Sequence, residues 1–140
     1  RWLMQSGQSF ESHPTDFTLS CPGFKGPRNV EDHSGGHLTF TIGNAVVAHI
    51  GYQELIESWQ AAASLSASEA LSMTETAGRH LSHILEQGLA GVDLSEAATD
   101  AAVILLLAMR RQGVSDPKRI PACTVMWNGQ EGRERVLLSA

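Results

Sequence analysis

Polar and apolar positions alternate along the start of residues 37–50, and a Gly-Asn dipeptide interrupts the alternation. Gly-Asn between two β-prone runs is typical of a two-residue hairpin turn, because Gly tolerates the positive φ that such a turn requires. The register that this turn dictates pairs Ile42 with Ala45 and Leu38 with His49. The pattern therefore predicts a β-hairpin with His49 on a mostly apolar face.

The second strand of this hairpin is apolar on both faces. In the predicted register, Val46, Ala48 and Ile50 lie on the face opposite His49. We therefore expect the strand to be central in its sheet, or to have its outer face covered by another element or another subunit, and we take these three residues as candidate interaction residues. His37 falls on the face opposite His49, so the two histidines are not expected to form a metal pair.

Helical periodicity follows in three segments, at about 52–65, 67–87 and 94–112. Ser66 or Ser68 can cap the second helix, and Asp93 can cap the third. The third segment is apolar nearly all round, so we expect it at the centre of the helical layer.

The second helix should bury a stripe of apolar residues that runs along one side. The members of this stripe are Ala70, Met73, Ala77, Leu81, Ile84 and Leu85. Gly78 lies beside the stripe and is expected to be a point of close contact with another element. Ser82 falls on the opposite, polar side.

A second hairpin is predicted over about 122–138, around Asn128-Gly129. Residues 1–36 are rich in Gly, Ser, Pro and polar residues, with one short strand predicted at 16–21, and they are interpreted as an arm or loop region. Residues 37–140 are interpreted as a single domain. The expected fold class is α+β, with an antiparallel or mixed sheet built from the two hairpins and three helices packed on one face.

The stretch from Arg79 to Gln87 contains the residues that most resemble a chemical site, His80, His83 and Glu86. Side chains three apart on a helix are neighbours, so His80 and His83 could chelate one ion. Six residues turn a helix by about 600°, which leaves Glu86 about 120° away from His80. The HExxH pattern of zinc hydrolases is absent.

The favoured interpretation of this stretch is therefore a solvated helix face. The alternative is a site for a divalent metal such as zinc on His80 and His83, completed by ligands from elsewhere in the chain, such as His33, His37, His49 or a cysteine. No catalytic residue is assigned, and no organic cofactor is predicted because the sequence lacks GxGxxG and GxxxxGK[ST] motifs.

Charge is distributed unevenly along the chain. The net charge is -5, which disfavours a general nucleic-acid binder. Residues 51–100 carry eight carboxylates against one arginine, whereas residues 110–135 carry six cations against three carboxylates. The candidates for binding an anion are Arg110, Arg111, Arg119 and Arg133. The simpler interpretation is that these arginines complement a helix end and lie on a solvated strand.

Two cysteines, Cys21 and Cys123, lie far apart in sequence and form no CxxC motif. Reduced, buried thiols are the favoured interpretation, and a disulfide is the alternative.

The apolar run 101–109 is about half of what a membrane crossing needs, so no membrane span is expected. The chain opens at Arg1 without a recognisable leader, so we expect a cytoplasmic protein, although the sequence could be a piece of a longer one.

The sequence thus favours a small non-enzymatic accessory, regulatory or structural protein that acts through protein–protein contacts, with a protein partner or a homo-oligomer. One alternative is a metal-binding or hydrolytic enzyme that uses His80 and His83. Another is a binding module for an anionic ligand at the C-terminal basic residues.

Overall fold

The computed structural model describes residues 16–24, 36–43, 45–87 and 94–138. In chain order, the described elements are β1 (Phe17–Cys21), β2 (His37–Ile42), β3 (Ala45–Gly51), α1 (Tyr52–Ala63), α2 (Ala67–Glu86), α3 (Leu94–Arg111), the short 3-10 helix η1 (Pro117–Arg119), β4 (Cys123–Asn128) and β5 (Arg133–Leu138). The five strands form one antiparallel sheet in the order β3-β2-β1-β4-β5. None of the described helices is long and apolar enough to cross a membrane.

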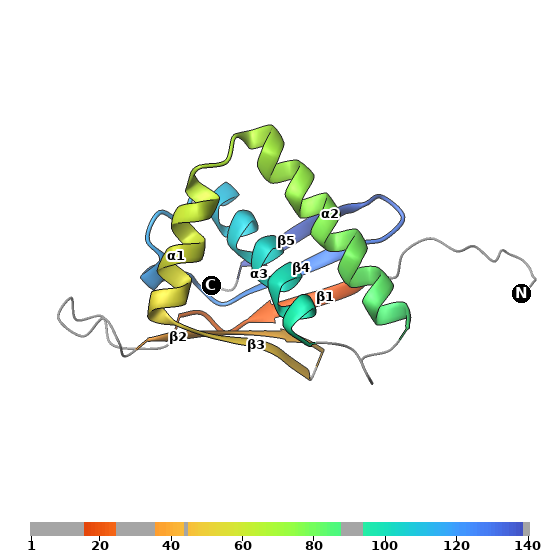
Figure 1. Cartoon of the computed structure of the whole chain (residues 1–140), viewed down its shortest axis with the longest axis horizontal. Coiled ribbons are helices and arrows are strands. Elements are labelled where there is room, and N and C mark those ends of the chain that lie inside the picture. Colours follow the sequence, from red (N-terminus) through yellow and green to blue (C-terminus); the bar gives the residue numbers. More distant parts are fainter. Residues whose placement is uncertain (1–15, 25–35, 44, 88–93, 139–140) are drawn as a thin grey trace, which may run out of the picture.

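The helices cover one face of this sheet, which confirms the predicted α+β fold (Figure 1). Helix α1 packs over β2 and β3, α2 reaches β5, and α3 lies between them against β3 and β2. The short strand predicted before the first hairpin is β1, and it is the middle strand of the sheet. Residues 17–21 therefore belong to the same core as the described residues of β2 to β5 and of the three long helices.

Alternate residues of the strands face the helices and form the core. Phe17, Leu19, Leu38, Phe40 and Val125 are buried on this face, because successive side chains of a strand point to opposite sides of the sheet. Threonines such as Thr18 and Thr39 occupy the other face. The sheet thus has one apolar and one polar face, as is common for antiparallel sheets.

The β2–β3 hairpin keeps the predicted turn but not the predicted register. Ile42 pairs with Ala45 as expected. The register then shifts between Phe40 and Thr41, so that Leu38 pairs with Ile50 and not with His49. The cause is a β-bulge, in which one extra residue of β3 is accommodated before pairing resumes.

The bulge separates the three candidate interaction residues. Val47 and Ala48 are consecutive and are both buried, at 6% and 9% exposure, which a regular strand would not allow. Val46 is 58% exposed, whereas Ala48 and Ile50 face the helices. The expectation that all three share an outer face was wrong, because the bulge inverts the alternation after Val46.

Strand β3 is also an edge strand and not a central one. Its apolar residues on both sides follow from the bulge, since residues before and after it use opposite phases of the alternation. The proposed subunit contact through Val46 remains a prediction.

Helix α2 begins with the predicted cap and packs against the sheet through Gly78. Ser66 accepts a hydrogen bond from the Glu69 backbone N–H, and the Glu69 side chain accepts one from the Ser66 backbone N–H. A Cβ on Gly78 would lie 2.3 Å from the Trp127 ring. The absence of a side chain at Gly78 therefore lets α2 approach β4 closely, as the sequence suggested.

The buried side of α2 is rotated relative to the predicted stripe. Thr74 and Ser82 are buried, whereas Met73 is 42% exposed. The Thr74 hydroxyl donates to the Ala70 carbonyl, which satisfies this buried polar group within the helix. The placement of Ser82 on a solvated face was therefore wrong, because the buried side of α2 extends to Ser82, which is 0% exposed.

Helix α3 ends within one residue of the predicted bound, and Gly113 follows it in the left-handed conformation at φ 93°, with the Val114 N–H donating to the Met109 carbonyl. Its predicted cap at Asp93 lies outside the described residues.

The second hairpin has a four-residue loop, since Asn128 pairs with Arg133. Gly132, at φ 72°, supplies the positive φ of this loop.

Candidate functional site

The predicted histidine pair on α2 is divided between two sets of carboxylates. His80 Nδ1 lies 2.6 Å from Asp100 Oδ2 on α3, and its Nε2 lies 3.8 Å from Glu96 Oε1. His83 Nδ1 lies 3.6 Å from Glu86 Oε1 on its own helix. Each histidine therefore contacts a different carboxylate.

Burial raises the pKa of the Asp100 carboxyl, and the nearby His80 opposes this effect. The Asp100 Oδ2 atom is buried and lies close to His80 Nδ1, although the two atoms are not in hydrogen-bonding geometry. No group of three or more His, Cys, Asp or Glu residues that could hold a metal occurs in the described part of the chain. The third ligand that the metal hypothesis needs is not found there, and the candidate His33 lies outside the described residues.

His37 and His49 lie on the same face of the sheet, contrary to the predicted register. Their rings stack with centroids 4.5 Å apart, and His49 Nδ1 forms a hydrogen bond of 3.1 Å with the Thr39 hydroxyl. The bulge is the cause, because it places His49 opposite Thr39 and not opposite Leu38. The separation of these two histidines was thus a wrong prediction.

The four arginines proposed to bind an anion each contact a nearby group within the chain. The contacts are Arg110 over the Trp59 ring at 5.1 Å, Arg111 with Glu134, Arg119 with Asp116 at 3.7 Å, and Arg133 with Glu131 at 3.2 Å. Burial lowers the pKa of Arg111. Carboxylates already neutralise three of these cations, and the arrangement gives the anion hypothesis no added support.

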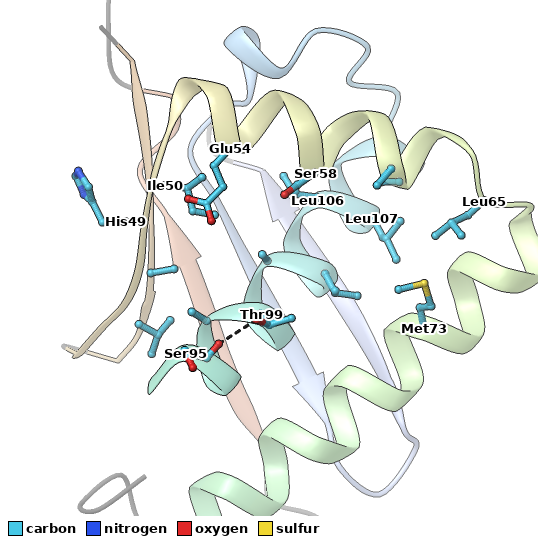
Figure 2. A pocket seen from close by; sticks show the side chains of 17 residues that line it. His49, Ile50, Glu54, Ser58, Leu65, Met73, Ser95, Thr99, Leu106 and Leu107 are labelled. Carbon is cyan, nitrogen blue, oxygen red and sulfur yellow. Dashed lines mark hydrogen bonds between the residues drawn. The ribbon is translucent and has the colours of Figure 1, made fainter. Parts of the chain in front are cut away.

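A groove of about 690 Å³ with a mostly apolar lining lies among the described residues. It lies between α1 and α3, with β3 at one end and Met73 of α2 at the other (Figure 2). The lining residues are Val47, Ala48, His49, Ile50, Glu54, Ser58, Ala61, Ala62, Leu65, Met73, Ser95, Ala98, Thr99, Ala102, Val103, Leu106 and Leu107.

Helix α3 lines the groove with one continuous stripe. The contributing positions are Ser95, Ala98, Thr99, Ala102, Val103, Leu106 and Leu107, spaced alternately by three and one residues. This spacing defines one side of an α-helix. Helix α1 contributes Glu54, Ser58, Ala61 and Ala62, which lie on one side of that helix, and Leu65 lines the groove just after α1 ends. Both helices thus present a stripe to the same space.

The groove is hollow because small side chains line both helices. Ala61 and Ala62 on α1 and Ala98 and Ala102 on α3 all line it. Helix α3 also packs more extensively against α2 than against α1. The space between α1 and α3 is therefore left open in the described structure.

Polar side chains are a minority among the lining residues of the groove. Glu54 and Ser58 project into it from α1, whereas the His49 imidazole points away on the far side of β3 (Figure 2). At the start of α3, the Thr99 hydroxyl donates to the Ser95 carbonyl at 3.0 Å. Apart from His49, Glu54 is the one ionisable side chain among the described lining residues.

Sequence reasoning missed this groove, although one signal pointed toward it. Residues 101–109 are apolar nearly all round, and for this reason we expected the helix at the centre of the helical layer. Half-buried Ala102 and Val103 show that one side of α3 is covered less than the other. A pattern of apolar residues does not say what will cover them.

No protein-family model matches the chain, and no curated protein or solved structure shows significant similarity to it.

Proposed function

We propose that this protein is a non-enzymatic interaction module whose groove binds an amphipathic helix of a partner protein. The observation that carries the proposal is the pair of facing stripes on α1 and α3, which resembles the apolar channel into which a third helix packs. An occupant with apolar residues at i, i+3, i+4 and i+7 would cover the open side of α3.

The dimensions of the groove suit such an occupant. From Ser95 to Leu107 the stripe on α3 is about 18 Å long, at the rise of an α-helix, and accommodates a partner helix of about three turns. The alanines on both sides allow a helix backbone to approach closely. Met73, at 42% exposure, supplies an adaptable apolar contact at the α2 end.

Charge favours a partner helix with basic residues beside its apolar face. Glu54 projects into the groove and is the acidic side chain among its described lining residues. Acidic residues also dominate α1 and α2, where Glu54, Glu57, Glu69, Glu75 and Glu86 accompany Arg79. A second copy of the chain would bring α1 or α2 with the same sign of charge, so charge complementarity favours a different, basic partner.

The other two function classes draw less support. An enzyme or metal protein based on His80 and His83 needs further ligands beyond the carboxylates that these histidines contact. A module for anionic ligands needs arginines that are not already paired with Glu134, Asp116 or Glu131.

A designed Leu/Lys peptide that forms an amphipathic helix tests the proposal, with a scrambled peptide of identical composition as control. Fluorescence anisotropy of the labelled peptides should show binding of the amphipathic order and at least tenfold weaker binding of the scrambled one. Backbone amide shifts in NMR should localise the bound peptide to α1 and α3. Equal binding of the two peptides, or shifts centred on the open face of the sheet, would contradict the proposal.

A pair of neighbouring variants isolates the groove itself. Ala62 lines it, whereas Ala63 is exposed on α1 and does not. Ala62→Phe should fill the space and weaken peptide binding about tenfold or more, while Ala63→Phe should leave it unchanged. Thermal midpoints check that both variants fold.

An apolar small molecule is the competing occupant for a space of this volume. Selective binding of lauric acid in place of the peptide would contradict the helix proposal.

A further inference from the structure

Cys21 and Cys123 are direct partners across the middle of the sheet. Cys21 is the last residue of β1 and Cys123 the first of β4, and their Cα atoms are opposite each other in the antiparallel register. Strand β1 connects the β2–β3 hairpin to the β4–β5 hairpin. The two cysteines therefore lie at the junction between the two halves of the sheet, 102 positions apart in the chain.

Their geometry suits a covalent bond. Directly opposed residues of antiparallel strands have Cα atoms about 4.5–5.5 Å apart, and disulfides span Cα separations of about 4.4–6.8 Å. Both side chains point to the helix-covered face and are buried, at 4% and 2% exposure. Neither cysteine is in a disulfide in this structure.

The two sulfur atoms already interact as thiols. A hydrogen bond with Cys21 and burial both raise the pKa of the Cys123 thiol. The Gly23 backbone N–H donates to Cys21 Sγ at 3.4 Å. The side chains are thus directed toward each other at the same end of their strands.

We propose that Cys21 and Cys123 form a reversible dithiol–disulfide site that joins the two halves of the sheet when a disulfide oxidant such as oxidised glutathione is present. One cysteine, as its thiolate, attacks a sulfur of the oxidant, and one glutathione leaves as a thiol. The second cysteine then attacks the mixed disulfide and releases the second glutathione. The protein loses two electrons and two protons, which the two glutathione thiols carry.

Burial makes this site slow to react and, once oxidised, slow to be reduced. A raised thiol pKa lowers the thiolate fraction, and the thiolate is the reactive species. Access requires local opening, which is easiest at strand ends such as Cys21 and Cys123. The site therefore behaves as a durable structural bond and not as a fast sensor.

The bond should stabilise the fold strongly, because it closes a loop of about 100 residues in the unfolded chain. We expect the thermal midpoint of the oxidised protein to exceed that of the reduced protein by about 10 °C. Because the disulfide stabilises the folded chain, folding also stabilises the disulfide. The folded chain should therefore retain the disulfide at a ratio of reduced to oxidised glutathione about a thousandfold higher than the unfolded chain does.

The test equilibrates the full chain with reduced and oxidised glutathione, with and without urea. Alkylation of remaining thiols and intact mass measure the oxidised fraction, and peptide mapping identifies the bond. We expect an intrachain Cys21–Cys123 disulfide, the higher thermal midpoint, and reversal of both by dithiothreitol. Cys21→Ala and Cys123→Ala serve as controls, and neither should gain stability in oxidised glutathione.

Two results would overturn the proposal. The first is a wild-type protein that forms only mixed disulfides with glutathione or disulfides between chains. The second is an intrachain bond that forms at the same glutathione ratio in the folded and unfolded states, with no rise in the thermal midpoint. Neither result bears on peptide binding in the groove, which is tested separately.

Discussion

Helix α3 has two apolar sides that the fold treats differently. The side toward the sheet is completely buried, as Ala97, Ala101 and Ile104 show. The side toward α1 also carries apolar residues, but Ala98, Ala102 and Val103 are only half-buried and line the groove, next to the exposed Ser95 and Thr99. The two sides therefore differ in what packs against each.

This comparison separates two reasons for an apolar helix face. Residues on the sheet side contribute to folding, because unfolding returns their surface to water. Residues on the groove side contribute less to folding and retain surface that a partner can bury. Substitutions on the two sides should therefore affect different measurements.

The largest expected effect contrasts neighbours on α3. Ile104→Ala should lower the free energy of unfolding by about 3 kcal/mol, since it removes fully buried carbons and leaves a cavity. Val103→Ala should lower it by about 1 kcal/mol or less, because Val103 is half-buried beside the groove. Urea denaturation of both variants provides the measurement. Equal losses would show that the two sides are equally covered.

A second contrast extends the comparison to α2. Gly78→Ala should destabilise the protein by about 2 kcal/mol, because the new Cβ meets the buried Trp127 ring. Met73→Ala, on the groove side of the same helix, should change the free energy of unfolding by about 0.5 kcal/mol or less. Thermal and urea denaturation measure both. A neutral Gly78→Ala would mean that α2 and β4 are not closely packed.

A third contrast concerns binding and not stability. Glu54→Gln should weaken binding of the basic Leu/Lys peptide by about 0.5–1 kcal/mol, which is a few-fold in affinity. The reason is that Glu54 projects into the groove. Glu57→Gln removes the same charge from the exposed side of α1 and serves as the control. Anisotropy titrations measure the peptide affinities of Glu54→Gln and wild type, and these affinities should converge as the salt concentration rises. Identical effects of the two variants would indicate general attraction and not docking at the groove.

The smallest expected effect tests α3 where it meets α2. The pKa of Asp100 is raised by burial and by Glu96, and His80 opposes both. Because the folded pKa lies above the unfolded one, the protonated carboxyl contributes stability in acid that is lost as pH rises through the folded pKa. Asp100→Asn should remove this contribution to the pH dependence of the free energy of unfolding. The contribution is less than about 1 kcal/mol, because solvent screens the carboxyl.

Unfolding measured in urea between about pH 4 and pH 7 provides the test. The expected result is that the free energy of unfolding of wild type falls relative to that of Asp100→Asn as pH rises through this range. Unchanged profiles would show that the carboxyl is solvated, in spite of its position between two helices.

Most of the fold could be predicted from local patterns. The Gly43 turn, the Ser66 capping box and the Gly113 terminus are decided by a few adjacent residues. The order of the strands could not be predicted, because placing Phe17–Cys21 between the hairpins depends on contacts across the whole chain. The rotation of α2 was missed for a similar reason, since Ser82 is buried by what packs on it.

The candidate site was less accessible to prediction. A single extra residue at Val47 changed the face of His49, and alternation alone gives no sign of such a bulge. The groove depends on the spacing between α1 and α3, which no local pattern specifies. Histidines and arginines attracted attention by their chemistry, whereas the alanines that shape the groove did not.

The bulge in β3 has a further consequence for how molecules of this protein meet. An edge strand exposes unpaired backbone groups that can recruit another strand and begin intermolecular sheet growth. At Val47 the bulge interrupts the regular spacing of those groups along the β3 edge of the sheet. That edge is therefore a poor template for a neighbouring chain, and crowded copies of the protein are protected there from aggregation by strand addition.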